Sequence, residues 1–142
     1  WIKEIYESIT IYLFNSEDNE INHIYYEPSW IPDGFSLVDS YQDSDYCLRI
    51  YANDTGEKMF SVEYTLMQHT SMSTTAQEYS EVVKVDINGL PADLYIGNET
   101  SSENALIWVD EANQVVFNIQ GNISNEDIVH IAQSLILSIS TK

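Results

Sequence analysis

The sequence predicts an α+β fold: a curved antiparallel sheet of about seven or eight strands, connected as a meander and as hairpins, with an N-terminal helix and a C-terminal helix packed on one face. Short segments of alternating hydrophobicity recur along the middle of the chain and are bounded by turn-forming residues. Segments with helical periodicity stand near both ends. Because no repeat and no Pro/Gly-rich linker divides the 142 residues, we expect a single domain, residues 1–142.

The front of the chain, residues 1–23, is expected to form a short helix followed by a strand. Trp1, Ile5 and Ile9 belong to an apolar series at helical spacing. The run ITIYLF that follows is β-branched and aromatic, which favours a strand. The acidic stretch NSEDNE then predicts a solvated loop, and the core of the domain is expected to span residues 24–142.

A turn followed by three strands comes next. Pro32 suits the second position of a β-turn and Gly34 the fourth, which places this turn at residues 31–34. The expected strands are 35–41, 46–52 and 58–67, joined as a meander through the turn formers DSD and NDTGE. The third strand alternates cleanly, so we expect one apolar face to be buried and Ser61, Glu63 and Thr65 to face water.

Two further hairpins are predicted. Asn88-Gly89 favours a type I′ turn, and Pro91 just after it predicts that the following strand starts late or lies at a sheet edge. The next hairpin turns at DEAN and brings Trp108 near Phe117 for cross-strand aromatic contact. The strands expected in this region are 83–87, 92–96, 105–109 and 115–120.

The chain is predicted to close with a capped amphipathic helix. Ser124 is a suitable N-cap, Asp127 stands three residues later, and Ile123 with Ile128 can form a hydrophobic staple. An apolar stripe then recurs at helical spacing and should pack on the sheet. Its residues are Ile128, Ile131, Ala132, Leu135, Ile136 and Ile139.

Composition excludes several classes of function. Five Lys plus Arg against 23 Asp plus Glu give a net charge of −18, which repels nucleic acids and anionic lipid surfaces, so we expect no nucleic-acid partner. Cys47 is the single cysteine, so no intrachain disulfide and no cysteine-based zinc site can form. Its place in a strand-like run predicts a buried, inert thiol.

The motifs of common chemistries are absent from the sequence. It contains no G-x-S-x-G, G-x-x-x-x-G-K-[ST] or G-x-G-x-x-G, and its three histidines, His23, His69 and His130, are not at metal-ligand spacing. Asp39, Asp43 and Asp45 lack the spacing and glycine of a calcium loop. We therefore predict no catalytic residues, no cofactor and no metal, and expect that the protein is not an enzyme.

Aromatic residues are the weak candidates for ligand binding. Tyr25, Tyr26 and Trp30 cluster beside the predicted turn, where they would line a groove for an apolar or peptide ligand. Trp108 is the fourth candidate, in the middle of a hairpin strand. Core packing is the default interpretation for all four, and ligand binding is the alternative.

Three segments together resemble a known family. They are YYEPSWIPDGF, VDINGLPADLY and ALIWVDEANQVVFNIQGNISNEDIVHIAQSL, with Tyr26, Pro28, Pro32 and Gly34 in the first and Trp108 in the third. Their order over residues 24–137 resembles the Domain of Unknown Function 4367 family. The resemblance implies an extracytoplasmic domain of a bacterial membrane protein, in some members behind an anti-sigma-factor-like cytoplasmic part, and brings no catalytic residues with it.

The start at Trp1 rather than Met agrees with this implication, because an upstream membrane helix would then precede the chain. No apolar run here approaches the length of a membrane span, so the fragment itself is expected to be soluble. Three hypotheses remain for function. They are a non-catalytic sensory or interaction domain with an extracytoplasmic protein or peptide partner, a carrier that shelters an apolar ligand or lipid in its curved sheet, and a hydrolase with an unrecognised carboxylate or tyrosine site.

Overall fold

The structure, a computed structural model, describes residues 22–66, 79–98 and 103–141. Most of these residues belong to two antiparallel sheets, one of seven strands and one of two. The N-terminal helix and strand were expected within residues 1–23, of which residues 1–21 lie outside the described part of the chain. In chain order the elements are β1 (Asn22–Pro28), β2 (Phe35–Gln42), β3 (Tyr46–Asn53), β4 (Met59–Leu66), β5 (Tyr79–Ile87), β6 (Leu90–Gly97), β7 (Asn104–Asp110), β8 (Val115–Gly121), α2 (Asn125–Gln133) and β9 (Leu135–Thr141).

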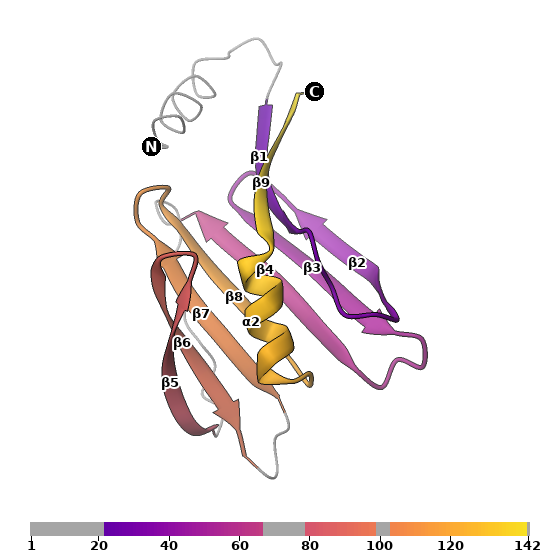
Figure 1. Cartoon of the computed structure of the whole chain (residues 1–142). Coiled ribbons are helices and arrows are strands. Elements are labelled where there is room, and N and C mark those ends of the chain that lie inside the picture. The colour runs from indigo at the N-terminus through magenta and orange to yellow at the C-terminus, as the bar shows by residue number, and fades with distance from the viewer. Residues whose placement is uncertain (1–21, 67–78, 99–102, 142) are drawn as a thin grey trace.

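The large sheet consists of two meanders that lie side by side (Figure 1). Its strand order is β2-β3-β4-β8-β7-β6-β5, so the meander expected for the first three strands is confirmed. The second meander, β5 to β8, joins the first where β4 pairs with β8. The sheet is open, and β2 and β5 form its two edges. Each of the seven predicted strands after the first turn is present, with small differences at the ends.

Helix α2 begins as predicted but ends early. The Ser124 hydroxyl accepts a hydrogen bond from the backbone N–H of Asp127 at 3.1 Å, as an N-cap should. The helix then ends at Gln133, because the backbone N–H of Ser134 turns back to the carbonyl oxygens of His130 and Ile131. The expectation that the apolar stripe continues as helix to Ile139 is therefore wrong.

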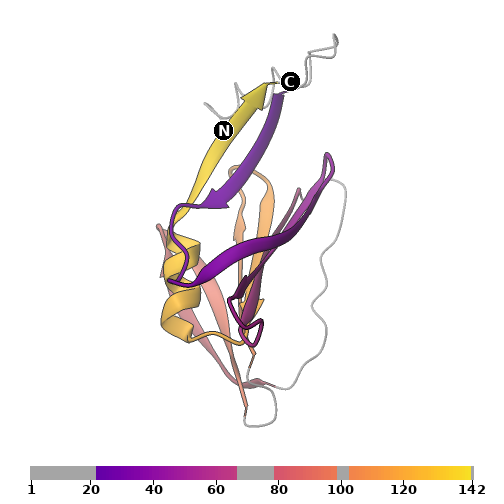
Figure 2. The same cartoon turned by 90° about the vertical axis from the view of Figure 1, so that its right-hand side faces the viewer.

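The residues after Ser134 form strand β9 and pair with β1 in a separate antiparallel ribbon. The sequence LILSIST is rich in β-branched residues and alternates in polarity, so it suits a strand once a partner is present. Leu135 still packs against the core, whereas Ile136 and Leu137 are exposed. Figure 2 shows α2 on one face of the sheet and the β1–β9 ribbon extending beyond the end of the sheet.

The turns contain the residue types that their geometry requires, but one of them lies at a different position from the one predicted. Asn88 and Gly89 both have positive φ, 52° and 94°, as the predicted type I′ turn requires. The turn before β2 lies one residue later than expected. The Pro32 carbonyl accepts a hydrogen bond from Phe35 N at 3.2 Å, which puts Gly34, with φ 88°, at the third position.

The expectation for Pro91 is also wrong, because β6 starts before this residue and lies inside the sheet. Hydrogen-bonded and non-hydrogen-bonded pairs alternate along an antiparallel ladder. In the two-residue hairpin the closing pair, Ile87 and Leu90, is hydrogen-bonded, so the nitrogen of Pro91 faces away from β5. The β6–β7 ladder begins only at Ala92, so the missing N–H of proline leaves no ladder bond unmade.

The core lies between α2 and the face of the sheet that the helix covers, which we call the core face. Ile128 and Ile131 of α2 are fully buried there, as are Leu106 of β7 and Ile119 of β8. Burying a side chain of this size stabilises the fold by about 1.5–3 kcal/mol. The predicted contact between Trp108 and Phe117 is confirmed, with stacked rings 4.7 Å apart.

Candidate functional site

Strand β2 is an edge strand whose side chains are exposed on both faces of the sheet. Seven of its eight residues are exposed, and only Phe35 is partly buried. Three large apolar side chains are among those exposed, Leu37 at 50%, Val38 at 56% and Tyr41 at 56%. An edge strand with exposed apolar side chains is a ready template for pairing with another extended segment.

The backbone of β2 presents hydrogen-bonding groups away from its neighbour β3. Asp43 N donates to Tyr46 O at 2.9 Å, which makes these two residues a hydrogen-bonded pair. Since the pairs alternate, Gln42 and Ser40 direct their N–H and C=O groups outward from the sheet. The outward N–H of Ser40 donates to the Asp39 carboxylate at 2.9 Å, so part of the edge is capped by its own side chain.

A bulge further restricts what can pair with this edge. The register of β2 against β3 shifts between Leu37 and Asp39, which leaves Val38 as the extra residue. A bulge bends the strand and raises its local twist. Together with the Asp39 carboxylate it protects the edge against unselective strand pairing.

The opposite edge, β5, differs in its side chains. Lys84 donates to the Asp93 carboxylate at 2.6 Å, and a lysine on an edge strand opposes pairing with another strand. Val82 is the large apolar side chain of β5 that is exposed, at 53%. Both edge strands therefore have one side without a neighbouring strand, but their exposed side chains differ. Strand β5 can thus serve as the control in experiments that test binding to β2.

The outer face of the sheet, opposite α2, carries a chain of polar and aromatic contacts beside β2. Tyr41 OH donates to Asp43 at 3.2 Å, and the Tyr41 and Tyr46 rings lie 6.2 Å apart. Tyr46 OH donates to Oε2 of Glu63 on β4 at 2.6 Å. Burial and this hydrogen bond raise the pKa of the Tyr46 phenol well above its ordinary value, so the phenol stays neutral.

Asn118 of β8 ends this chain of contacts. It lies directly opposite Glu63 in the β4–β8 ladder, and its Nδ2 is 3.5 Å from Oε1 of Glu63. Asn118 is 8% exposed, and its Oδ1 is one of the buried polar atoms that have no hydrogen-bond partner within the described part of the chain. We call Tyr41, Tyr46, Glu63 and Asn118 the outer-face cluster.

Side chains on the outer face are less exposed to water than the alternation in the sequence predicts. Thr65, expected to face water, is only 5% exposed. This short side chain sits between Tyr46 on β3 and Val116 on β8, its registered neighbours, which shield it. Glu63 is half-buried for the same reason, since β4 is a central strand.

Other chemistry finds little support among the described residues. No three histidine, cysteine, aspartate or glutamate side chains in this part of the chain come close enough to hold a metal ion. Oxygens of Asp39 and Asp43 accept hydrogen bonds from nearby backbone N–H groups. Cys47 is buried, as predicted, and burial raises the pKa of its thiol.

The four aromatic residues proposed as ligand contacts lie in different surroundings. Tyr26 and Trp108 are buried and both contact Phe117, with ring centroids 4.9 and 4.7 Å apart. Trp30 is half-buried and stacks on His130 of α2 at 3.7 Å. Tyr25 lies in β1, opposite Ser138 of β9. A role of these residues in ligand binding stays a prediction.

Sequence reasoning did not find the outer-face cluster. Its available signal was the alternation of β4, which correctly puts Glu63 on the face opposite the apolar residues. Asn118 joins Glu63 only through the β4–β8 pairing, between residues 55 positions apart. No local pattern indicates that pairing.

Fold and site together define the class of this protein: an α+β domain built on an open antiparallel sheet, with one helix on its core face and an exposed edge strand. The family resemblance seen in the sequence is confirmed. The chain belongs to the family described as Domain of unknown function (DUF4367), whose model matches residues 25–135. No curated protein matches the sequence.

Among solved structures, the chain is similar to one described as the crystal structure of MucB in complex with MucA(peri). The two share 14% sequence identity with a TM-score of 0.43, over 78% of this chain and 35% of that one. The chain thus spans about a third of the length of that relative.

Proposed function

We propose that this chain is a non-catalytic interaction domain that binds an extended segment of another protein along β2. In this proposal it acts on the extracytoplasmic side of a bacterial membrane, as part of an anchored regulatory protein. The observation that carries the proposal is the exposed β2 edge, with outward backbone groups at Ser40 and Gln42 and three exposed apolar side chains beside them.

The location and the anchor have separate support. The family resemblance implies an extracytoplasmic domain behind a membrane helix. Among the described residues no helix is long and apolar enough to cross a membrane. The strongly acidic surface, with its net charge of −18, suits a protein that acts at a distance from the anionic lipid surface.

The hydrolase hypothesis has less support. A nucleophile needs an adjacent base or a lowered pKa, and the Cys47 thiol and the Tyr46 phenol show the reverse. Burial raises the pKa of Cys47, and burial together with Glu63 raises the pKa of Tyr46. His130, the histidine with a described side chain, stacks on Trp30 rather than facing a hydroxyl or thiol.

The carrier hypothesis has less support for a geometric reason. An apolar ligand sheltered by the sheet would occupy its core face. Over β7 and β8 that face is covered by α2, and Ile128 and Ile131 of the helix are fully buried against it. A ligand there would have to displace the helix from the core.

Photo-crosslinking tests the binding edge. A photo-reactive amino acid replaces Val38 on β2 or, as the control, Val82 on β5, which is equally exposed. Both variants are made in the full-length protein and irradiated in cells of its source. We expect a discrete adduct from position 38 and none from position 82. Equal adducts from both positions, or none from either, would contradict the proposal.

A backbone variant makes this test specific for strand pairing. Ser40→Pro removes an outward N–H while leaving the β2–β3 bonds intact, since Ser40 belongs to a non-hydrogen-bonded pair. It should abolish the adduct, whereas Ser40→Ala, which keeps the N–H, should retain it. Thermal unfolding of both variants checks that the domain still folds. An adduct that survives Ser40→Pro in a folded domain would rule out strand addition.

Reporter fusions test the location. Alkaline phosphatase fused to the C-terminus of the full-length protein is active only outside the cytoplasm, and a green fluorescent protein that folds only in the cytoplasm provides the reciprocal control. We expect phosphatase activity without fluorescence. The opposite pattern would overturn the extracytoplasmic assignment while leaving the binding edge untouched.

A further inference from the structure

We propose that Asn88 is a site of spontaneous deamidation, and that two hydrogen bonds of the folded domain keep this site in an unreactive state. Asn88 and Gly89 form the turn between β5 and β6. Conversion of Asn88 releases this turn from the end of α2. The proposal is independent of the proposed binding function, because β5 and β2 are opposite edges of the sheet.

The reaction begins at the backbone nitrogen of Gly89. This nitrogen loses its proton to a base from the solvent and bonds to Cγ of Asn88, which closes a five-membered succinimide ring. The bond between Cγ and Nδ2 breaks, and Nδ2 takes up a proton and leaves as ammonia. Water then opens the ring at one of its two carbonyl carbons. The product at position 88 is aspartate, or isoaspartate, in which the main chain runs through the former side chain.

The sequence and the surroundings of the turn both suit this reaction. Asn88 is the only asparagine in the sequence that is followed by glycine, and glycine has no side chain to hinder the attack of its own nitrogen. Both residues of the turn are exposed. No atom lies within 4 Å of a Cβ added to Gly89, so neighbouring groups do not crowd the turn. What restrains the reaction is therefore hydrogen bonding rather than steric hindrance.

The first hydrogen bond restrains the attacking nitrogen. Gly89 N donates to Oδ2 of Asp86 at 3.0 Å. Before it attacks, the nitrogen must lose this proton, and a negative charge then develops next to the Asp86 carboxylate. Repulsion between like charges disfavours that state. The attack therefore requires a conformation in which Asp86 has turned away from the turn.

The second hydrogen bond restrains the group that leaves. Asn88 Nδ2 donates to the backbone carbonyl oxygen of Gln133 at 3.2 Å, across 45 positions of the chain. Gln133 is the last residue of α2, and the last carbonyls of a helix have no partner within the helix. The bond thus ties the β5–β6 turn to the helix end and fixes the side-chain amide of Asn88. The succinimide ring can close only after this bond breaks.

The product turns an attractive contact into a repulsive one. Asn88 offers a donor to the helix end, whereas aspartate or isoaspartate offers a carboxylate, which only accepts. The C-terminus of a helix carries about half an elementary negative charge, so the new carboxylate is repelled there. Isoaspartate also lengthens the main chain of a two-residue turn, which the type I′ geometry does not accommodate.

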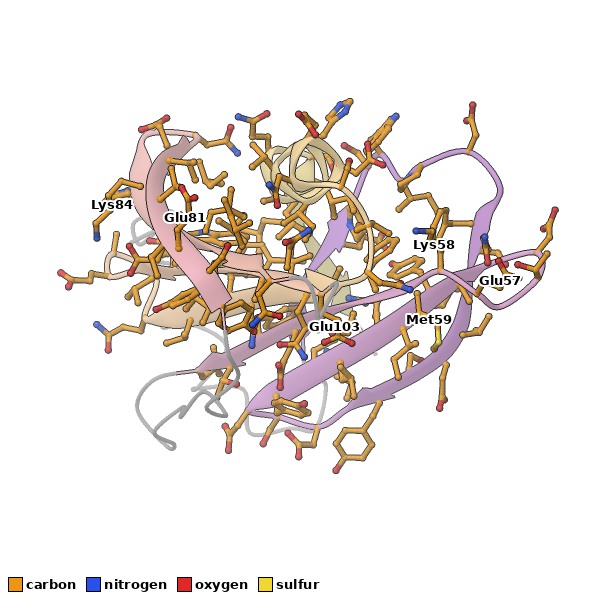
Figure 3. All side chains as sticks on the ribbon, turned by 90° about the horizontal axis from the view of Figure 1, so that it is seen from below. Glu57, Lys58, Met59, Glu81, Lys84 and Glu103 are labelled. Atoms are coloured by element: carbon orange, nitrogen blue, oxygen red, sulfur yellow. The ribbon has the colours of Figure 1, made fainter. Side chains whose placement is uncertain are left out.

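The basic side chains that the structure describes do not compensate the new charge. Lys84 of β5 points away from α2, and Lys58 lies at the opposite side of the sheet (Figure 3). Arg49 belongs to β3 in the other meander. His130, in the last turn of α2, stacks on Trp30. Deamidation therefore separates the β5–β6 turn from the end of α2.

Timed incubation tests the site and its restraint. The folded protein and the same chain unfolded in guanidinium chloride are kept at one mildly alkaline pH, and mass spectrometry follows the peptide that contains Asn88. The folded protein should react about tenfold more slowly or less, since breaking one hydrogen bond to a charged acceptor suffices for that factor. Equal rates would overturn the restraint. An Asn88 that stays intact in the unfolded chain would overturn the site itself.

A pair of variants tests the role of Asp86. Asp86→Asn keeps an oxygen that accepts from Gly89 N but removes the charge, so deamidation of the folded protein should become about tenfold faster. Glu57→Gln removes one charge at the far side of the sheet and should leave the rate unchanged (Figure 3). The unfolded chains of both variants should react like the original. A folded Asp86→Asn protein that reacts no faster than Glu57→Gln would contradict the role of the Asp86 charge.

Hydrogen exchange tests the consequence for α2. Asn88→Asp reproduces one product, and it should speed exchange of the Ser134 backbone amide, which closes the helix, about threefold or more. Amides of β3 should not change. Asn88→Gly keeps a turn of type I′ and loses only the hydrogen bond, so its effect should be smaller. Unchanged exchange at Ser134 in Asn88→Asp, or an equal effect of Asn88→Gly, would refute the release of the helix end by charge.

Discussion

Gly121 controls the seam between the two meanders, and its replacement by alanine should be among the most damaging single changes to the fold. It ends β8 and lies opposite Phe60 of β4, in the ladder that also sets Glu63 against Asn118. A Cβ at this position would lie 2.6 Å from the Cα of Phe60 and still closer to the carbonyl oxygen of Met59. Both are backbone atoms, so no side-chain rotation relieves the overlap.

The cost follows from this geometry. Overpacking a well-packed interior costs about 1–3 kcal/mol, and here strand β4 itself must move, so we expect about 3 kcal/mol. Gly56→Ala is the control. Gly56 has φ 79° but no atom within 4 Å of an added Cβ. An alanine there therefore introduces only backbone strain, which should lower the free energy of unfolding by about 1–2 kcal/mol.

Urea denaturation followed by tryptophan fluorescence measures both free energies of unfolding. The free energy of unfolding should be highest for the original chain, lower for Gly56→Ala and clearly lowest for Gly121→Ala. If Gly121→Ala costs no more than Gly56→Ala, the close approach of the two strands at Gly121 is wrong.

Three further predictions concern the core, the helix cap and the tyrosines. Ile128→Ala, at a fully buried position, should lower the free energy of unfolding by about 3 kcal/mol in urea denaturation, and a loss below 1 kcal/mol would contradict the packing of α2 on the sheet. Ser124→Ala should cost about 1 kcal/mol by the same measurement, because Asp127 N loses its acceptor, whereas Ser124→Asp should restore most of it. Burial raises the pKa of Tyr46 and Tyr64 in the folded state, so folding holds these protons after the unfolded chain has released its own. The stabilisation is complete below about pH 10 and is lost as the pH rises further, and Tyr46→Phe should flatten that loss in denaturation at alkaline pH.

The strands of the large sheet could be predicted because their signals are local. Alternation marks each strand, and turn residues such as Asn88-Gly89 mark the breaks between them. The order of the strands could not be predicted in the same way. Whether β4 continues to β5 or pairs with β8 depends on contacts between distant segments, and the sequence offers several equally apolar candidates.

The end of α2 shows how two local patterns can compete. Leu135, Ile136 and Ile139 continue the helical stripe, while Leu135, Leu137 and Ile139 also alternate as a strand would. A contact between distant parts of the chain decides the outcome. Ser134, the C-cap, accepts a hydrogen bond from Trp30 N at 3.2 Å across 104 positions, and β1 then supplies the ladder for β9.

The candidate site was beyond sequence reasoning for a related reason. The residue type alone does not show whether an aromatic side chain is buried or exposed. The burial of Tyr26 and the exposure of Tyr41 therefore follow only from their places in the assembled sheets. Tyr26 packs edge-on against Tyr64 in the core, whereas Tyr41 stands 56% exposed on the edge strand. The difference comes from strand position, since an edge strand has no neighbour to cover its outer side.

Asp39 connects the stability of this edge with its selectivity. Its carboxylate accepts a hydrogen bond from the outward N–H of Ser40, so a strand that pairs with β2 at this position must first displace this exposed, charged acceptor. A segment with a lysine or arginine near that position compensates the displaced carboxylate with an ion pair. The same residue that opposes pairing with an unselected neutral strand therefore favours a partner that carries a positive charge at this position, as expected where selectivity comes from disfavouring the wrong partners.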